Sequence, residues 1–145
     1  MNDERGRHVL GLPEMDEQHR YLYRLFDSIE NGPQVVDKKR MENLVTELER
    51  YLNFHFASEE LLMRSYKYPA FAQHQSDHEN AANRFFQFAE DLDGDRLNPA
   101  ALRIFLTGWL MEHSLTIDAD YASWIRQCRL DAGISNSNPP AKQVG

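Results

Sequence analysis

Apolar residues recur at alternating three- and four-residue steps through four stretches of the chain, which is the spacing of one buried face of an α-helix. The four expected helices cover about 16–30, 37–66, 71–92 and 99–124. No useful length of sequence alternates with a period of two, as a half-buried strand would. Short, turn-rich segments separate the stretches. The pattern predicts an all-α, antiparallel, up-down-up-down four-helix bundle.

The helix ends carry their own signals. Asp16 is a plausible N-cap for the first helix, and Gly32-Pro33 is a clear stop after it. An extended N-terminal arm precedes this helix. Residues 132–145 are small, polar and proline-bearing, so we expect a frayed C-terminal tail. The expected organisation is one bundle domain over 1–131, followed by a flexible tail over 132–145.

Composition excludes several classes of protein. At 145 residues, the chain fits a single domain with a proper core. Its net charge of -7 argues against nucleic acid or an anionic membrane as a partner. The single cysteine, Cys128, permits no internal disulfide. The polar N-terminus lacks the apolar core of a signal peptide, so we expect a cytoplasmic location.

Polar side chains interrupt the apolar faces. In "NFHFASEELLM" (53–63), His55 and Glu59 stand one helical turn apart among Phe54, Phe56 and Leu61. An imidazole and a carboxylate are each costly to bury alone. All four helices place at least one histidine on the inward face, and two also place a carboxylate there. The full inward set is His19, His55, Glu59, His74, His78, His113 and Asp118.

Each of these residues alone has an ordinary explanation. A single histidine in an apolar row is most often a hydrogen-bonded core residue, and Glu59 beside Glu60 could be a solvated helix residue. Convergence favours a metal, because five buried imidazoles without one would leave many nitrogens unsatisfied. Nitrogen and oxygen donors without thiolate suit iron or manganese. Seven donors exceed the needs of one tetrahedral zinc and suit two ions.

The spacing of His113 and Asp118 makes a separate prediction. Five residues turn a regular α-helix by about 500°, which leaves the two side chains about 140° apart. One face of a regular helix cannot hold both. The spacing therefore predicts a local widening of the helix between them, of the π-bulge type that often marks functional sites.

Four motifs resemble, in order and spacing, those of the hemerythrin family, and of single-domain bacterial hemerythrins in particular. They are "MDEQH" (15–19), "HFASEELLM" (55–63), "YPAFAQHQSDH" (68–78) and "WLMEHSLTID" (109–118). The resemblance covers roughly residues 8–127. It implies a non-haem centre of two iron ions with a bridging oxo or hydroxo group, which binds O2 reversibly.

The resemblance also implies a role for each donor. His74, His78 and His113 would hold one iron, and His19 and His55 the other. Both carboxylates, Glu59 and Asp118, would bridge the two ions. These donors and the bridging oxygen fill all but one position of two octahedral ions, and the open position lies on the iron with two histidines. O2 is expected to bind there.

The family resemblance places apolar walls around this O2 site. They correspond here to Leu22, Phe56, Trp109 and Leu110. One position departs from the family, because Ser114 stands where isoleucine is usual. Its hydroxyl could face the O2 pocket, which would put slow autoxidation in doubt. Alternatively, it could bond the Leu110 carbonyl within the helix.

Three functions compete on the sequence alone. The first is an O2-binding protein for carriage, storage or delivery to an oxygen-consuming enzyme. The second is an enzyme, namely a di-iron scavenger of peroxide or nitric oxide; a ferritin-like oxidase is disfavoured because no histidine has a Glu three residues before it. The third is an oxygen or redox sensor, which usually carries a further signalling domain. We expect the first, in a non-enzymatic monomer or weak homo-oligomer.

Overall fold

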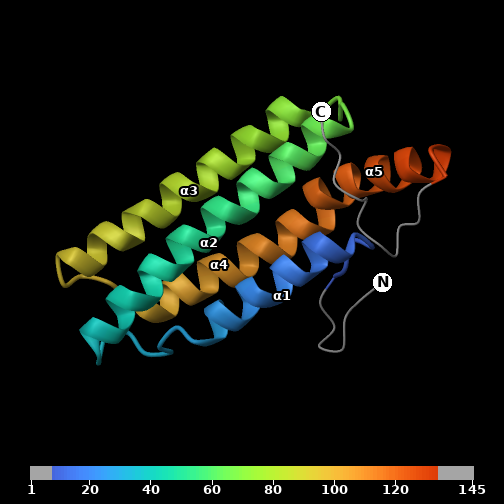
Figure 1. Cartoon of the computed structure of the whole chain (residues 1–145). Helices are drawn as coiled ribbons and strands as arrows, with labels where there is room; N and C mark the ends of the chain where they lie inside the picture. The colour runs from blue at the N-terminus through green and yellow to red at the C-terminus, as the bar shows by residue number, and fades with distance from the viewer. Residues whose placement is uncertain (1–7, 134–145) are drawn as a thin grey trace.

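The structure is a computed structural model that describes residues 8–133, so nearly all of the expected tail lies outside the described residues. Five α-helices and one short π-helical segment follow one another along the chain (Figure 1). They are α1 (Pro13–Asp27), α2 (Lys38–Ser65), α3 (Phe71–Asp93), α4 (Pro99–His113), η1 (Ser114–Asp118) and α5 (Ala119–Asp131).

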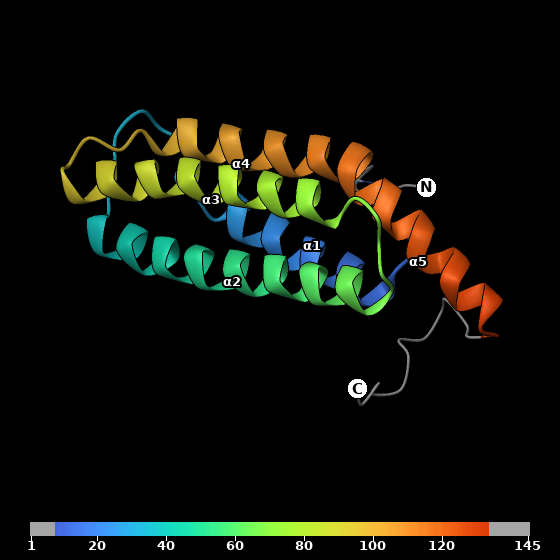
Figure 2. The same cartoon turned by 90° about the horizontal axis from the view of Figure 1, so that it is seen from above.

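The first four helices form the predicted up-down-up-down bundle. Helix α1 packs on α2 and α4, and α3 packs on the same two, so each helix contacts both of its neighbours. Short connections join antiparallel partners, as the turn signals predicted. Helix α5 continues from α4 through η1 and extends beyond the end of the bundle (Figure 2). Among the described residues, no helix combines the length and apolar character needed to cross a bilayer.

The first helix begins earlier than the sequence analysis predicted. It starts at Pro13, a residue whose fixed φ suits the first helical position. The assignment of Asp16 as its N-cap is therefore wrong. Instead, the Asp16 carboxylate accepts hydrogen bonds from the backbone N–H groups of Leu10 (2.7 Å) and Gly11 (3.1 Å). The residue that resembled a cap fixes the N-terminal arm against the helix.

Two other helix starts follow the usual capping rules. The Asp37 side chain accepts a hydrogen bond from the backbone N–H of Arg40 at 3.1 Å, which caps α2. The Asn98 side chain accepts one from Ala101 at 3.1 Å, and this cap precedes Pro99 at the start of α4. These caps fix where α2 and α4 begin and hence the register of the polar residues that they carry inward.

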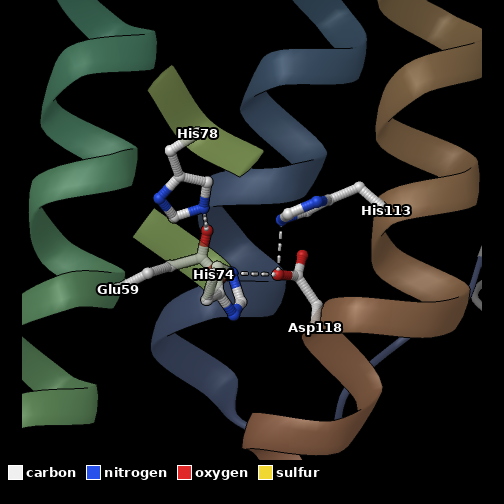
Figure 3. A group of neighbouring side chains, drawn as sticks. All are labelled: Glu59, His74, His78, His113 and Asp118. Atoms are coloured by element: carbon white, nitrogen blue, oxygen red, sulfur yellow. Dashed lines mark ion pairs between the residues drawn. The ribbon is translucent and has the colours of Figure 1, made fainter. Parts of the chain in front are cut away.

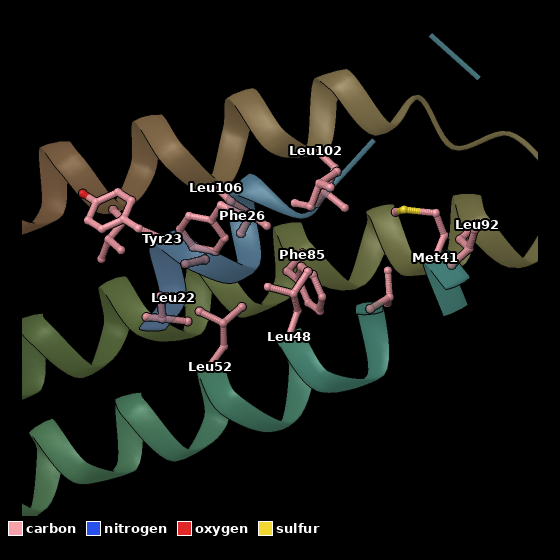
Figure 4. Packing of buried hydrophobic residues seen from close by; sticks show 14 of the residues in the cluster. Leu22, Tyr23, Phe26, Met41, Leu48, Leu52, Phe85, Leu92, Leu102 and Leu106 are labelled. Carbon is pink, nitrogen blue, oxygen red and sulfur yellow. The ribbon is translucent and has the colours of Figure 1, made fainter. Parts of the chain in front are cut away.

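The hydrophobic core divides into two clusters. The larger fills the bundle along α1 to α4 (Figure 4). The smaller lies where the N-terminal arm and α5 meet the bundle. On α1, Met15 belongs to the smaller cluster and Leu22 to the larger. On α2, Met63 belongs to the smaller cluster and Phe56 to the larger. The polar residues between these positions therefore lie between two apolar layers.

One expectation about the core is wrong in part. In the stretch 53–63, Phe56 and Met63 are buried, but Phe54 is 49% exposed and Leu61 is 62% exposed. Both lie on the outer side of α2. Neighbouring residues of a helix point in different directions, so apolar residues that are close in sequence need not share a face. The inward face of this stretch thus consists of Phe56 and Met63 with His55 and Glu59 between the layers.

Candidate metal centre

The seven predicted donor residues lie together in the interior of the bundle. All seven are buried. Their donor atoms form two groups, each within 4.8 Å and sharing Glu59. The larger group is drawn in Figure 3. The groups are Glu59, His74, His78, His113 and Asp118, and His19, His55 and Glu59.

Asp118 faces histidines of both groups. Its Oδ1 lies 2.9 Å from Nε2 of His113 and 3.0 Å from Nε2 of His74, and both ion pairs are among those drawn in Figure 3. Its Oδ2 lies 3.4 Å from Nε2 of His19, on the other side. A carboxylate placed in this way presents one oxygen to the three-histidine group and the other to the two-histidine group.

Glu59 also faces both groups. Its Oε1 lies 2.9 Å from Nε2 of His55 and 3.3 Å from Nε2 of His78, and its Oε2 lies 3.9 Å from Nε2 of His74. His55 belongs to the two-histidine group, and the other two belong to the three-histidine group. The two carboxylates therefore stand between the two sets of imidazoles.

The predicted widening of the helix is confirmed. Residues Ser114–Asp118 form a π-helical segment between α4 and α5. This wider turn brings His113, the last residue of α4, and Asp118, the last of η1, to the same side, with 2.9 Å between their facing atoms. A regular helix would have turned one of them away from the interior.

The donor atoms lack the hydrogen bonds that buried polar atoms normally make. The Nε2 atoms of all five histidines, and all four oxygens of Glu59 and Asp118, have no hydrogen-bond partner among the described residues. The facing nitrogen and oxygen atoms lie 2.9 to 3.9 Å apart, and the donor atoms of each group converge within 4.8 Å. Imidazole and carboxylate lone pairs that converge without donors fit a metal site, and the donor types suit iron or manganese.

The charges of the metal-free site compensate one another. Burial and the charge of Asp118 raise the pKa of Glu59, but the charge of His55 and the close contacts with the His55 and His78 imidazoles outweigh them and lower that pKa to about 2. Burial lowers the pKa of His113, but the charge and close approach of Asp118 raise that pKa to about 9. The raised pKa of His113 means that a proton held on this imidazole offsets part of the carboxylate charge.

Three histidines also have outward partners, which the sequence analysis did not identify. The Nδ1 of His78 donates to Glu60 Oε2 at 3.0 Å, and the Nδ1 of His55 donates to Gln18 Oε1 at 2.7 Å. The Nδ1 of His113 donates to Asp77. These bonds direct each Nε2 inward. The sequence analysis mentioned Glu60 only as the neighbour of Glu59 and gave it no role.

Two of the four predicted wall residues contact donor histidines, and the other two belong to the adjoining apolar core. Leu22 and Leu110 are fully buried in the larger core cluster. Phe56 stacks on the His78 ring with centroids 4.2 Å apart, and Trp109 stacks on the His113 ring at 4.6 Å. The two aromatic residues thus brace imidazoles of the three-histidine group, and they also contact each other edge to face at 5.6 Å.

Ser114 is buried, and its hydroxyl has no hydrogen-bond partner among the described residues. The predicted alternative, a bond from this hydroxyl to the Leu110 carbonyl, is therefore absent from the structure. Tyr121, one turn beyond Asp118, is also fully buried with an unpartnered hydroxyl, and its ring packs edge to face on His74 at 5.1 Å. It is part of the smaller core cluster and borders the centre.

Residues 10–125 match the sequence model of the hemerythrin HHE cation-binding domain. The chain belongs to the hemerythrin family. It is 28% identical over 119 residues to the bacteriohemerythrin of Clostridium acetobutylicum, which covers 77% of this chain and 92% of that protein. It is 28% identical over 112 residues to that of Aquifex aeolicus, covering 74% and 85%. The predicted resemblance to bacterial hemerythrins is confirmed.

More distant relatives share the family or the fold. The hemerythrin of Themiste dyscrita is 26% identical over 107 residues, which cover 74% of this chain and 79% of that protein. A crystal structure of wild-type hemerythrin superposes with a TM-score of 0.77 at 18% identity, and covers 86% of this chain and 97% of that chain. At that identity, the superposition shows the four-helix-bundle fold and nothing finer.

Proposed function

We propose that this hemerythrin-family protein binds O2 reversibly at a non-haem di-iron centre, for carriage, storage or delivery of oxygen. One observation carries the proposal: five unpartnered imidazole nitrogens converge in groups of three and two around two carboxylates that face both groups. A site of this composition accommodates two ions side by side. Hemerythrins as a family bind oxygen and are not enzymes, which supports a binding function.

The division of the donors suggests how iron would be held. His74, His78 and His113 would bind one ion, His19 and His55 the other, and Glu59 and Asp118 both. An oxo or hydroxo group would complete the bridge. When bound, the two irons supply the two electrons and the open position that reversible O2 binding requires. The buried carboxylates, costly without a cation, are then compensated by metal charge.

The residues around the donors control access of water. Phe56 and Trp109 present apolar surfaces to the histidines, and Leu22 and Leu110 belong to the same apolar cluster. An apolar wall withholds water and protons from the site, which favours release of unchanged O2 over irreversible oxidation of the iron. We propose these four residues as the lining of the O2 pocket.

The wider setting of the function is also a proposal. We infer a cytoplasmic protein, monomeric or weakly self-associating, that supplies O2 to an oxygen-consuming enzyme. Neither nucleic acid nor a membrane surface is an expected partner, because the net charge is -7.

The test is an absorption spectrum of iron-loaded protein, reduced under argon and then exposed to air. Charge-transfer bands that appear in air and vanish under argon over repeated cycles would support reversible O2 binding. Rapid conversion to a stable ferric spectrum, with no return under argon, would contradict it.

A second candidate function, scavenging of peroxide or nitric oxide, is favoured by Ser114. Ser114 follows the donor His113 in sequence, and its buried hydroxyl has no partner among the described residues. Such a hydroxyl can supply a proton or admit water, and both would shorten the lifetime of an oxygenated site. We expect Ser114→Ile to lengthen the lifetime of the oxygenated form at least several-fold. Thr116→Ile is the matched control, because Thr116 lies in the same segment but is exposed. Equal lifetimes in all three proteins would remove the support for scavenging.

A further inference from the structure

We propose that Glu60 and Asp77 make the three-histidine half of the centre the tighter metal site, so that the chain loads its two ions in a fixed order. This inference rests on the proposed di-iron centre and adds the assignment of two positioning residues and a sequence of assembly. The two halves differ in the side chains behind their imidazoles as well as in their number of histidines.

Glu60 is held in place from two sides. It lies on α2, next in sequence to Glu59 but directed at α3. Its Oε2 accepts the hydrogen bond from Nδ1 of His78 at 3.0 Å, and its Oε1 accepts one from Nε2 of Gln75 at 2.9 Å. The Glu60 side chain is half-buried, so this contact is only partly screened by water. Gln75 thus fixes the carboxylate that fixes His78.

Asp77 serves a second imidazole of the same half. It lies on α3 and accepts the hydrogen bond from Nδ1 of His113 on α4. Asp77 is half-buried, and His113 is buried. Two of the three histidines in this half therefore have a carboxylate behind them; the third, His74, has no partner at Nδ1 among residues 8–133.

The two-histidine half has no carboxylate behind its imidazoles. His55 donates from Nδ1 to the neutral amide oxygen of Gln18 at 2.7 Å. The Nδ1 of His19 has no hydrogen-bond partner in the part of the chain that the structure describes. Both halves share the charges of Glu59 and Asp118, so the outer charges of Glu60 and Asp77 distinguish them.

A carboxylate behind a histidine has a defined effect on its metal. By accepting the Nδ1 proton, it raises the basicity of the opposite nitrogen and fixes the ring orientation. Loss of such a partner typically weakens metal binding by about 10- to 100-fold. The three-histidine half should already bind metal more tightly, because it offers one more imidazole than the other half. The test must therefore separate the effect of the carboxylates from that of the ligand count.

The experiment is an anaerobic titration of the metal-free protein with cobalt(II), followed by visible absorption and calorimetry. We expect two separable binding steps. At one equivalent, paramagnetically shifted imidazole N–H signals should identify histidines of the three-histidine half. Glu60→Gln and Asp77→Asn should each weaken the first step about 10- to 100-fold and change the second much less.

Two further variants distinguish positioning from general destabilisation. Glu79→Gln is the matched control, because Glu79 is exposed on α3 next to His78, and it should leave both steps unchanged. Gln18→Glu introduces the missing carboxylate behind His55 and should tighten the second step about tenfold. A gain of affinity cannot come from a damaged fold, and it remains informative if Glu60→Gln fails to fold.

The outcomes separate this inference from the proposed function. If the wild-type protein binds no metal, the di-iron proposal itself fails. If it binds two ions, but Asp77→Asn leaves the first step unchanged and Gln18→Glu leaves the second unchanged, the loading order is not set by these side chains and the inference is overturned. Weakening of the first step and tightening of the second would establish it.

Discussion

The two nitrogens of each buried histidine have separate roles at this centre. Five Nε2 atoms face the carboxylates of Glu59 and Asp118, whereas three Nδ1 atoms donate outward to other side chains. The outward bond selects the tautomer that leaves Nε2 free as a lone-pair donor. A side chain that would be costly to bury by itself is thereby prepared for a cation.

Removal of a single donor should prevent the chain from holding two metal ions. Glu59→Ala removes a carboxylate that faces both groups, and His78→Ala removes one of three imidazoles on one side. We expect each variant to retain fewer than two irons per chain after desalting, measured by elemental analysis. Glu79→Ala, an exposed change on α3, is the control. Retention of two irons by both variants would contradict the ligand assignment.

The unpartnered hydroxyl of Ser114 leads to a prediction about stability. Because it has no hydrogen bond to lose, Ser114→Ala should leave the free energy of unfolding of the metal-free protein unchanged, or raise it by up to about 1 kcal/mol. Urea denaturation monitored by circular dichroism measures this. A loss of more than about 1 kcal/mol would mean that the hydroxyl is hydrogen-bonded within the helix.

At the scale of single residues, the inward donors were predictable and their outward partners were not. Residues such as His55 and Glu59 interrupt an apolar period, so their positions predict burial. Glu60, Asp77 and Gln18 sit at polar positions of their helices, where the sequence period gives no reason to single them out. Whether such a side chain reaches a neighbouring imidazole depends on the rotation and separation of two packed helices, which the period of one helix does not determine.

At the scale of elements, the sequence predicted which segments are helical and where the helix widens, but it misplaced the start of α1. The five-residue step from His113 to Asp118 cannot be accommodated in a regular turn, so simple geometry predicted η1. The start of α1 was misplaced because Asp16 has the chemistry of a cap, and it does bind backbone N–H groups. Those groups belong to the preceding arm and not to the first turn of the helix.

Gly108 offers a test of helix propensity within α4. A Cβ added there would meet nothing within 4 Å, and its φ is not in the left-handed region. Gly108→Ala should therefore raise the free energy of unfolding by about 0.5–1 kcal/mol, since glycine in a helix interior costs that much relative to alanine. Thermal or urea denaturation measures the change.

The contrasting variant is Gly11→Ala. Gly11 has a φ of +77°, and an added Cβ would lie 3.3 Å from Cδ of Arg126, so this change should destabilise the protein. If Gly11→Ala raised the free energy of unfolding as Gly108→Ala should, the left-handed backbone conformation of Gly11 would be contradicted.

At the scale of the whole molecule, a buried arginine connects α5 to the rest of the fold. Arg129 is fully buried; its Nη2 donates to Glu14 Oε1 at 2.6 Å, and its Nε donates to the Tyr66 hydroxyl at 3.2 Å. Glu14 lies in α1, and Tyr66 follows the end of α2. The end of the chain's last described helix is thus tied to the first two helices.

Breaking this contact should be costly because it leaves a buried charge alone. Glu14→Ala should lower the free energy of unfolding by about 3 kcal/mol, the usual cost of removing one partner of a buried ion pair. The double variant Glu14→Ala/Arg129→Met should be clearly more stable than Glu14→Ala, because no unpaired charge remains. Urea denaturation of the four members of this double-mutant cycle measures the coupling. Additive losses would show that the two side chains act independently.

The seven donors come from all four bundle helices and from η1, and this has a kinetic consequence. Residues as far apart in sequence as His19 and Asp118 must be brought together before a complete site exists. We therefore expect metal to bind after the transition state for folding, so that its stabilisation slows unfolding and leaves the folding rate nearly unchanged. Stopped-flow measurements with and without cobalt(II) test this. Bound metal should then lengthen the lifetime of the folded state, whereas contacts between apolar side chains set the rate of folding.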